Sequence, residues 1–354
     1  MSFKPAISSM SLGRAWVHKL LPKLDAAVAN GLKGIEVFYE DLEHLAREQN
    51  SLDKTSTTPL SDQMLLKAAR TIKKWCDERD IVVIGLQPFS LYEGLLDRTE
   101  HAKHIEKMKV WLQLAKALGS DIIQIPANFL PAEQITGDLN IVVKDLQEVA
   151  DMGAKESPVI RFAYENLCWS TYFDTWEKVW DVVERVNRPN FGICLDTFNI
   201  AGRVYADPAS SSGCTPNGPA DLAASLRNMA KSIDVKKVFF IQVVDAEKMR
   251  MPLVEGHAFY DKDQPTRMSW SRNARLFYGE KSEGGYLPVE DVLKTIIVEL
   301  EYKGWVSMEL FSRTMDDPDE KVPMQHAKRA AVSWEKVQKD IKRWTQEPSC
   351  CIIL

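Results

Sequence analysis

The segment Phe191–Asp196 reads FGICLD, an apolar run that ends on a single carboxylate. A short run without polar alternation is typical of a strand that is buried on both faces of a parallel sheet. Seven other short runs of this kind are spread along the chain: Ala6–Met10, Gly34–Tyr39, Val82–Gln87, Asp121–Pro126, Ile160–Glu165, Val238–Val244 and Trp305–Phe311. The pattern predicts eight strands.

Segments with the apolar period of helices lie between these runs. They are predicted at Leu20–Ala29, from a capping Ser61 through Cys76, at His101–Leu118, from Pro288 to near Lys303, and at Pro323–Trp344. Alternation of strand and helix predicts an α/β fold, and eight units favour a closed (β/α)8 TIM barrel. An open dinucleotide-binding sheet would need a GxGxxG motif after its first strand, and none is present. We expect one domain, residues 1–346, and a short tail, 347–354.

Two connections are too long to be simple turns. One follows the sixth strand, from Ile200 to Pro219, and the other follows the seventh, from Asp245 to Gly285. Both follow the carboxyl end of a strand, which is the catalytic face of a TIM barrel. We expect them to be lids or specificity loops.

Composition and charge narrow the classes of partner. The chain has 354 residues, 45% of them hydrophobic and 27% charged, with a net charge of −5 and an isoelectric point near 5.8. This balance is typical of a soluble globular protein and gives no reason to expect nucleic acid as a partner. No apolar run approaches the ~20 residues of a membrane span, and the N-terminus lacks a signal-peptide pattern. A cytoplasmic protein is expected, and a homo-oligomer is left open.

Six cysteines are scattered without CxxC spacing, which favours free thiols over disulfides. The chain ends Cys351-Ile352-Ile353-Leu354, which fits a C-a-a-X prenylation box, with Cys350 beside it. The alternative is an apolar tail that fits a loose pattern by chance. The sequence leaves a prenyl anchor at Cys351 open.

Four successive predicted strands each place a carboxylate or an amide within an apolar run. These residues are Glu165, Asp196, Gln242 and Glu309. A single buried acid can be satisfied by hydrogen bonds or cap the next helix, but three carboxylates at one barrel mouth repel one another unless a cation joins them. An all-oxygen set without His or Cys favours Mg or Mn over Zn, and Co is left open. The sequence predicts a divalent-metal site.

Several longer stretches resemble the xylose-isomerase-like barrel superfamily, and within it the 3-dehydroshikimate dehydratases of fungal quinate catabolism. The stretches are Gly34–Asp41, Ile123–Leu130, Phe162–Glu165, Cys194–Asn199 and Arg267–Arg272. The resemblance extends from Ile7 to about Trp334. It implies a xylose-isomerase-like barrel whose metal is held by the four residues named above.

The resemblance also implies a substrate site in the loop after the seventh strand. Ser271 and Arg275 look like the family's binders of the substrate carboxylate, with Arg272 beside them. An arginine fork suits a planar carboxylate. For Arg272 and Arg275 the alternative is an ordinary solvated loop charge.

One position departs from the family pattern. Bacterial relatives carry a basic side chain three residues after the acid of the sixth strand, where this chain has Asn199. An asparagine amide is not a general base. The resemblance therefore leaves proton transfer to a metal-bound water, to Glu165, or to a lid residue such as His257. An ordinary exposed loop histidine is the alternative for His257.

The expected function is a metal-dependent lyase that dehydrates the small molecule 3-dehydroshikimate to protocatechuate. A sugar-phosphate or polyol isomerase or epimerase would use the same metal site. A repair nuclease on this fold would need strand-end histidines and a basic face, which the sequence lacks. A non-catalytic, membrane-tethered pseudoenzyme is the third alternative, with Asn199 as its sign of lost catalysis.

Overall fold

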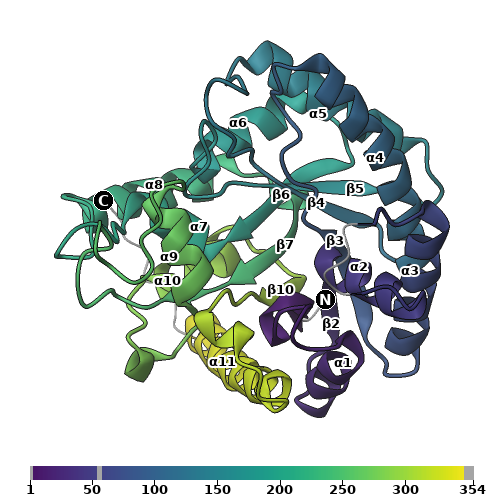
Figure 1. Ribbon diagram of the computed structural model, residues 1–354. Coiled ribbons are helices and arrows are strands. Elements are labelled where there is room, and N and C mark those ends of the chain that lie inside the picture. The colour runs from purple at the N-terminus through teal and green to yellow at the C-terminus, as the bar shows by residue number, and fades with distance from the viewer. Residues whose placement is uncertain (1–2, 54–57, 347–354) are drawn as a thin grey trace.

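A closed barrel of eight parallel strands forms the centre of the molecule (Figure 1). The computed structural model describes residues 3–53 and 58–346. The barrel strands are β1 (Lys4–Ser8), β2 (Gly34–Phe38), β3 (Val82–Gln87), β4 (Ile122–Pro126), β5 (Arg161–Glu165), β6 (Phe191–Asp196), β7 (Val238–Val243) and β10 (Trp305–Met308). The barrel closes where β1 pairs in parallel with β10, from Lys4 opposite Trp305 to Ile7 opposite Met308. The predicted TIM barrel is confirmed.

Helices surround the barrel, as the apolar periods predict (Figure 1). They are α1 (Leu20–Ala29), α2 (Tyr39–Gln49), α3 (Asp62–Asp77), α4 (Arg98–Leu118), α5 (Leu139–Ala154), α6 (Trp176–Val186), α7 (Thr197–Val204), α8 (Gly218–Ser232), α9 (Thr266–Ala274), α10 (Val289–Lys294) and α11 (Val322–Gln346). Ser61 caps α3 by accepting from the backbone of Met64, as predicted. The last helix, α11, lies against α1 at the foot of the view.

The predicted helix from Pro288 to near Lys303 is too long. The structure has α10 followed by a π-helical turn, Thr295–Glu299, that ends at Leu300. Glu301 then takes a positive φ of 56°, which a continuing α-helix does not allow. The chain therefore leaves the helix before Lys303.

Both long connections contain regular structure that the sequence did not reveal. The first one begins within α7, whose N-terminus is capped by Asp196, and α8 already starts at Gly218, so only residues 205–217 are irregular. The second contains α9 and a two-stranded antiparallel sheet, β8 (Asp245–Ala246) with β9 (Arg275–Leu276). This sheet anchors α9 beside the carboxyl end of the barrel.

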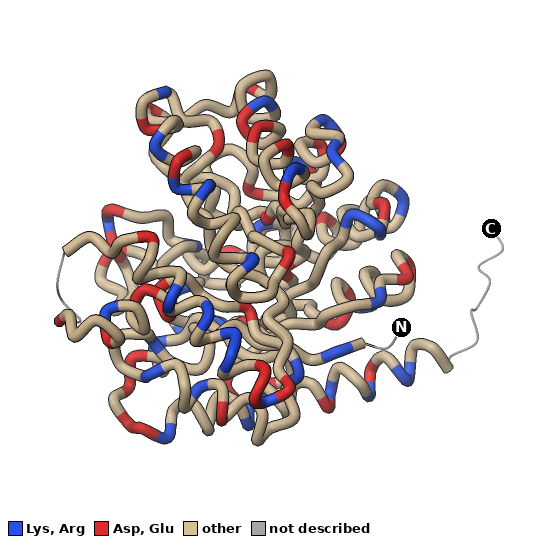
Figure 2. Tube along the Cα trace, turned by 90° about the vertical axis from the view of Figure 1, so that its right-hand side faces the viewer, with Lys and Arg blue, Asp and Glu red and all other residues tan. Residues whose placement is uncertain are grey.

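Other predictions concern the surface and the tail. Cys350 and Cys351 lie outside the described residues; of the cysteines that the structure does describe, Cys76, Cys168, Cys194 and Cys214 are all free. Within residues 3–53 and 58–346, none of the helices is long and apolar enough to span a membrane. Lys and Arg are interspersed with Asp and Glu over the helices (Figure 2).

Candidate active site

The polar residues of the strand ends share the inner face of the barrel. Successive side chains of a strand point to opposite faces, so residues two apart lie on the same face. Ala163, Cys194 and Phe240 belong to a small buried cluster of strand side chains that is separate from the main core. Glu165, Asp196 and Gln242 each follow one of these residues by two positions. The small cluster therefore forms the floor on which the polar residues stand.

Asn199, in the first turn of α7, joins two of the predicted metal ligands. Its Nδ2 donates to Glu165 Oε1 at 2.9 Å and to Asp196 Oδ2 at 2.8 Å. Its Oδ1 accepts from the backbone N–H of Cys168 at 3.1 Å, which fixes the amide's orientation. The asparagine thus holds the two carboxylates at one point.

Arg275, in β9, joins the same cluster to the last barrel strand. Its Nη1 lies 2.9 Å from Asp196 Oδ2 and 2.7 Å from Glu309 Oε2. Its Nε donates to Ser271 Oγ at 2.9 Å. Because the arginine is only 2% exposed, its guanidinium is a buried counter-charge to the acids.

Gln242 connects the cluster to an acid that the metal prediction did not include. Its Nε2 donates to Glu309 Oε1 at 2.9 Å and to Glu36 Oε2 at 3.0 Å. Glu36 also accepts from Gln87 at 2.7 Å and from the Ser307 hydroxyl. Four acids, Glu36, Glu165, Asp196 and Glu309, therefore meet inside the barrel.

The acids are poorly solvated and repel one another. Burial, followed by the charges of Asp196 and Glu309, raises the pKa of Glu165 well above its usual value. Burial also raises the pKa of Glu309 to about 7, although Arg275 opposes the shift. Burial and the charge of Glu309 raise the pKa of Glu36 in the same way. One guanidinium does not balance the charge of all four acids, so they either keep protons, as the raised pKa values indicate, or take up a further positive charge.

The residues of this cluster fit a divalent metal by the chemistry of their donors. As the side chains stand, no group of three or more His, Cys, Asp and Glu among residues 3–53 and 58–346 has the spacing of a metal site. Arg275 lies between two of the acids, and the Gln242 amide nitrogen faces Glu309. A half-turn of that amide presents its oxygen instead, which completes a set of hard oxygen donors. Glu165, Asp196, Gln242 and Glu309 would hold the ion.

The sequence prediction missed three polar residues of the cluster: Glu36, Gln87 and Gln124. Gln124 donates to Glu165 Oε2 at 2.5 Å, and the other two bond to each other. Each lies in an apolar strand, as the four predicted ligands do. The same signal is therefore present in strands β2 to β4 as well.

A cavity of about 660 Å³ opens above the acids. Its charged lining consists of Arg14, Glu40, Glu43, Lys107, Glu165, Arg272, Arg275 and Glu309, and its aromatic lining includes Trp16, Tyr39, Trp169 and Phe311. Ser271 also lines it. The structure therefore brings the three predicted substrate-binding residues into one cavity with Glu165 and Glu309.

His257 is not brought into this cavity. It lies in the connection between β8 and α9, where its Nδ1 accepts from the backbone of Phe259 at 3.0 Å and its ring contacts the Phe259 ring. It is absent from the described residues that line the cavity. A catalytic role for His257 would need the loop to move.

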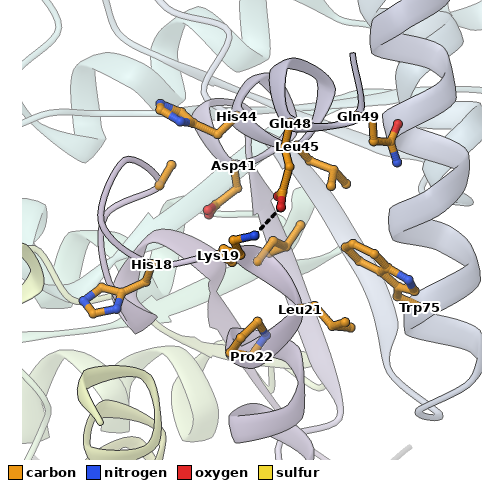
Figure 3. A pocket seen from close by; sticks show the side chains of 12 residues that line it. His18, Lys19, Leu21, Pro22, Asp41, His44, Leu45, Glu48, Gln49 and Trp75 are labelled. Atoms are coloured by element: carbon orange, nitrogen blue, oxygen red, sulfur yellow. Dashed lines mark hydrogen bonds and ion pairs between the residues drawn. The ribbon is translucent and has the colours of Figure 1, made fainter. Parts of the chain in front are cut away.

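A second cavity, of about 480 Å³, lies outside the barrel mouth beside α1 and α2 (Figure 3). Lys19 and Glu48 form an ion pair across it, and Trp75 lies on its far side from His18. Asp41, which also lines it, is already paired with the buried Lys23 at 2.6 Å. None of the strand-end acids of the barrel lines this cavity. The chemistry of the molecule therefore concentrates at the barrel mouth.

The barrel and the acids at its mouth are shared with a known protein family. A family model described as xylose isomerase-like TIM barrel matches residues 24–336. The chain belongs to this family. It is 52% identical over 347 residues to a 3-dehydroshikimate dehydratase of Neurospora crassa, a match that covers 97% of this chain and 95% of that protein. The resemblance to the fungal 3-dehydroshikimate dehydratases is confirmed.

More distant members of the family share the barrel. A 3-dehydroshikimate dehydratase of Pseudomonas aeruginosa is 26% identical over 290 residues, which cover 82% of this chain and 36% of the bacterial protein. The solved structure of a xylose isomerase-like TIM barrel/4-hydroxyphenylpyruvate dioxygenase fusion protein superposes with a TM-score of 0.71 at 23% identity, covering 98% of this chain and 45% of that one. The fungal match spans both proteins almost completely, whereas these two match part of a longer chain.

Proposed function

We propose that this chain is a metal-dependent 3-dehydroshikimate dehydratase, a lyase that converts 3-dehydroshikimate to protocatechuate and water. The observation that carries the proposal is the 52% identity over nearly the full length of a fungal protein of that name. The buried acids beneath a cavity with four cationic side chains support it, since the substrate is an anion with a ketone and hydroxyl groups.

The proposed metal ligands are Glu165, Asp196, Gln242 and Glu309, and the ion is Mg, Mn or Co. Bound there, a divalent ion supplies Lewis-acid stabilisation of the negative charge that develops on the substrate ketone oxygen. The same site would suit a sugar isomerase or epimerase. The full-length similarity to a dehydratase favours the dehydratase over that alternative and over the pseudoenzyme.

The chain's own residues position the substrate and transfer the proton. Glu165 is proposed to take the proton from the carbon next to the ketone in its carboxylate form, and its raised pKa makes that carboxylate a stronger base. Glu165 then returns this proton to the hydroxyl on the following carbon, which leaves as water, and loss of a second proton to solvent makes the ring aromatic. Asn199 acts as a positioning residue, because it fixes Glu165 and Asp196.

Ser271, Arg272 and Arg275 remain the proposed substrate-binding residues. Ser271 and Arg275 bond to each other beside the acids at the floor of the cavity, and Arg272 lies toward its solvent side. His257 stays a prediction for proton transfer that depends on movement of its loop. Location in the cytoplasm and assembly into a homo-oligomer are predictions from the sequence as well, and so is a prenyl anchor at Cys351.

The test follows the aromatic absorbance of protocatechuate after mixing purified protein, 3-dehydroshikimate and Mg or Mn. We expect metal-dependent growth of the signal, and loss of it with a chelator or with Glu309→Gln. Glu184→Gln, on the exposed face of α6, is the matched control and keeps full activity. A flat trace from protein that still binds metal contradicts the dehydratase proposal.

A further inference from the structure

Three consecutive residues at the end of β2 and the start of α2 line the cavity above the acids. They are Phe38, Tyr39 and Glu40. Phe38 is the last residue of β2, and α2 begins at Tyr39 without an intervening turn. None of the described side chains caps the N-terminus of α2. The position of this part of the cavity wall therefore depends on contacts other than a helix cap.

The Ser9 hydroxyl group links the end of β2 to the first turn of α2. The pairing of β1 with β2 ends at Ser8. One residue later, Ser9 Oγ accepts from the backbone N–H of Phe38 at 2.9 Å and donates to Asp41 Oδ2 at 2.6 Å. Ser9 and Asp41 are both buried. The hydroxyl group thus holds both ends of the segment 38–41.

The other oxygen of Asp41 forms a buried ion pair with Lys23 of α1. Lys23 Nζ lies 2.6 Å from Asp41 Oδ1, and the two side chains are 0% and 1% exposed. Burial lowers the pKa of Lys23, and the charge of Asp41 opposes this shift. A buried ion pair adds little net stability, because removing both charges from water is costly. Its main contribution is therefore to the placement of α2 against α1.

Asp41 makes both contacts because a carboxylate has two acceptor oxygens. Lys23 and the Ser9 hydroxyl group each donate to a different oxygen. An asparagine has one acceptor oxygen, so either Lys23 or the hydroxyl proton of Ser9 would lose its acceptor. Lys23 would also lose its counter-charge. Asp41→Asn therefore weakens this network while it keeps the shape of the side chain.

Glu40, beside Asp41, has an oxygen that lacks a donor. Its Oε2 is buried and accepts from none of the described residues, although the side chain lines the cavity. A buried acceptor without a donor is unfavourable unless a ligand supplies one. The proposed substrate carries hydroxyl groups that can donate. Glu40 is therefore suited to bind a hydroxyl group, provided that the first turn of α2 stays in place.

We propose that Lys23 and Asp41 are positioning residues for the substrate site. Through the network with Ser9 they hold Glu40 in the cavity wall, where Glu40 accepts a hydrogen bond from a hydroxyl group of the substrate. Neither Lys23 nor Asp41 lines the cavity, so both act through Glu40. This inference rests on the proposed function, since 3-dehydroshikimate supplies the hydroxyl group.

The test is the kinetics of protocatechuate formation from 3-dehydroshikimate at saturating Mg. We expect Asp41→Asn to raise KM roughly 10-fold and to leave kcat and metal affinity within about 2-fold of wild type, because a contact made equally in the ground and transition states is weakened. Asp340→Asn is the matched control and keeps the wild-type KM. Asp340 is also a buried acid that accepts from a lysine and a hydroxyl group, Lys336 at 2.8 Å and Tyr278 at 2.7 Å, but it lies on α11 outside the cavity lining.

A double variant separates the position of the wall from the stability of the fold. Lys23→Met/Asp41→Asn removes both charges, so neither is left buried alone. We expect its melting temperature to lie closer to that of wild type than the melting temperature of Lys23→Met does, while its KM stays raised. A wild-type KM in the double variant overturns the proposal.

Glu40→Met, which removes the acceptor, tests whether Asp41 acts through Glu40. This variant should raise KM by itself, and Asp41→Asn should add little to it, because the contact that Asp41 positions is already lost. Additive effects of the two substitutions overturn the assignment to Glu40.

The proposed function and this inference fail in different ways. Turnover by wild-type protein with an unchanged KM in Asp41→Asn overturns the inference and leaves the dehydratase proposal intact. Wild-type protein that binds metal and forms no protocatechuate contradicts the dehydratase proposal. Amide hydrogen exchange of residues 38–43 then tests the network: faster exchange in Asp41→Asn but not in Asp340→Asn supports it, and equal rates overturn it.

Discussion

At the scale of the residue, Asn199 shows how an amide can serve where its bacterial relatives are expected to carry a base. It transfers no proton, but it donates to two carboxylates from one nitrogen. Partners that orient the ligands of a metal are often as important for activity as the ligands. Asn199 therefore keeps the two carboxylates together, and in the proposed mechanism the proton is transferred by another group.

Asn199→Ala should lower both metal affinity and dehydratase activity by roughly 10- to 100-fold. The physical reason is that Glu165 and Asp196 lose the donor that holds them together. Metal titration and initial rates at saturating metal measure the two effects. Asn273→Ala is the control, because the Asn273 side chain donates to the carbonyl of Ser269 at 2.8 Å, away from the acids. Equal losses in the two variants would contradict a specific role for Asn199.

The residues of the candidate site were predictable only where a polar side chain interrupts an apolar strand in the sequence. Glu165 and Asp196 are visible as acids in apolar strands, and so is Glu36 once the rule is applied to every strand. Arg14 is not visible in this way, because an arginine after a Gly-containing turn looks like any surface charge. Only the fold places it in the lining of the cavity above the acids.

At the scale of the element, β6 depends on a glycine for its close approach to β7. A Cβ on Gly192 would overlap the carbonyl oxygen of Lys237 and lie 2.8 Å from the Phe239 ring. A Cβ on Gly85 in β3 would meet nothing closer than the Ile122 side chain, at 3.7 Å. The two glycines therefore offer a matched pair in one sheet.

Gly192→Ala should lower the free energy of unfolding by about 1–3 kcal/mol, since backbone has to shift to make room. Gly85→Ala should leave the free energy within about 1 kcal/mol of wild type, or raise it through a less flexible unfolded chain. Urea unfolding followed by circular dichroism distinguishes them. Similar values for the two variants would show that the crowding at Gly192 is relieved without cost.

The strands were predictable to within a few residues, whereas the elements of the catalytic loops were not. β6 and β3 have the bounds that their apolar runs predict. The sequence predicts a loop where α7 lies, because α7 follows β6 without a turn: Asp196 is both the last residue of β6 and the cap of α7. The two-stranded sheet β8–β9 joins residues far apart in sequence, a pairing that local patterns do not encode.

At the scale of the whole molecule, His326 of α11 connects the end of the chain to its beginning. Its Nδ1 lies 2.8 Å from the Ser11 carbonyl and its Nε2 3.1 Å from Thr314 Oγ1. Burial, followed by the charge of Arg329, lowers the pKa of His326 to about 4. The fold therefore requires this histidine to be neutral.

The free energy of unfolding should fall as the pH drops from about 6.5 to about 4, because the unfolded state takes up a proton that the folded state resists. The loss assigned to this residue is about 3 kcal/mol, fully present only below the folded-state pKa. Urea unfolding at pH 7 and pH 4 measures it in wild type and in His326→Gln. The variant should lose less between the two pH values; an identical loss would place the acid sensitivity elsewhere.

Barrel closure between β1 and β10 also has a consequence for biosynthesis. A chain leaving the ribosome presents β1 first, and the neighbour on one of its edges is not made until Trp305–Met308 has been translated. A sheet formed by the seven strands made before then would have two unpaired edges, with which other nascent chains could pair. Premature termination before residue 305 would thus produce an aggregation-prone fragment. Slow translation would lengthen the time for which chaperones must protect the unpaired edges.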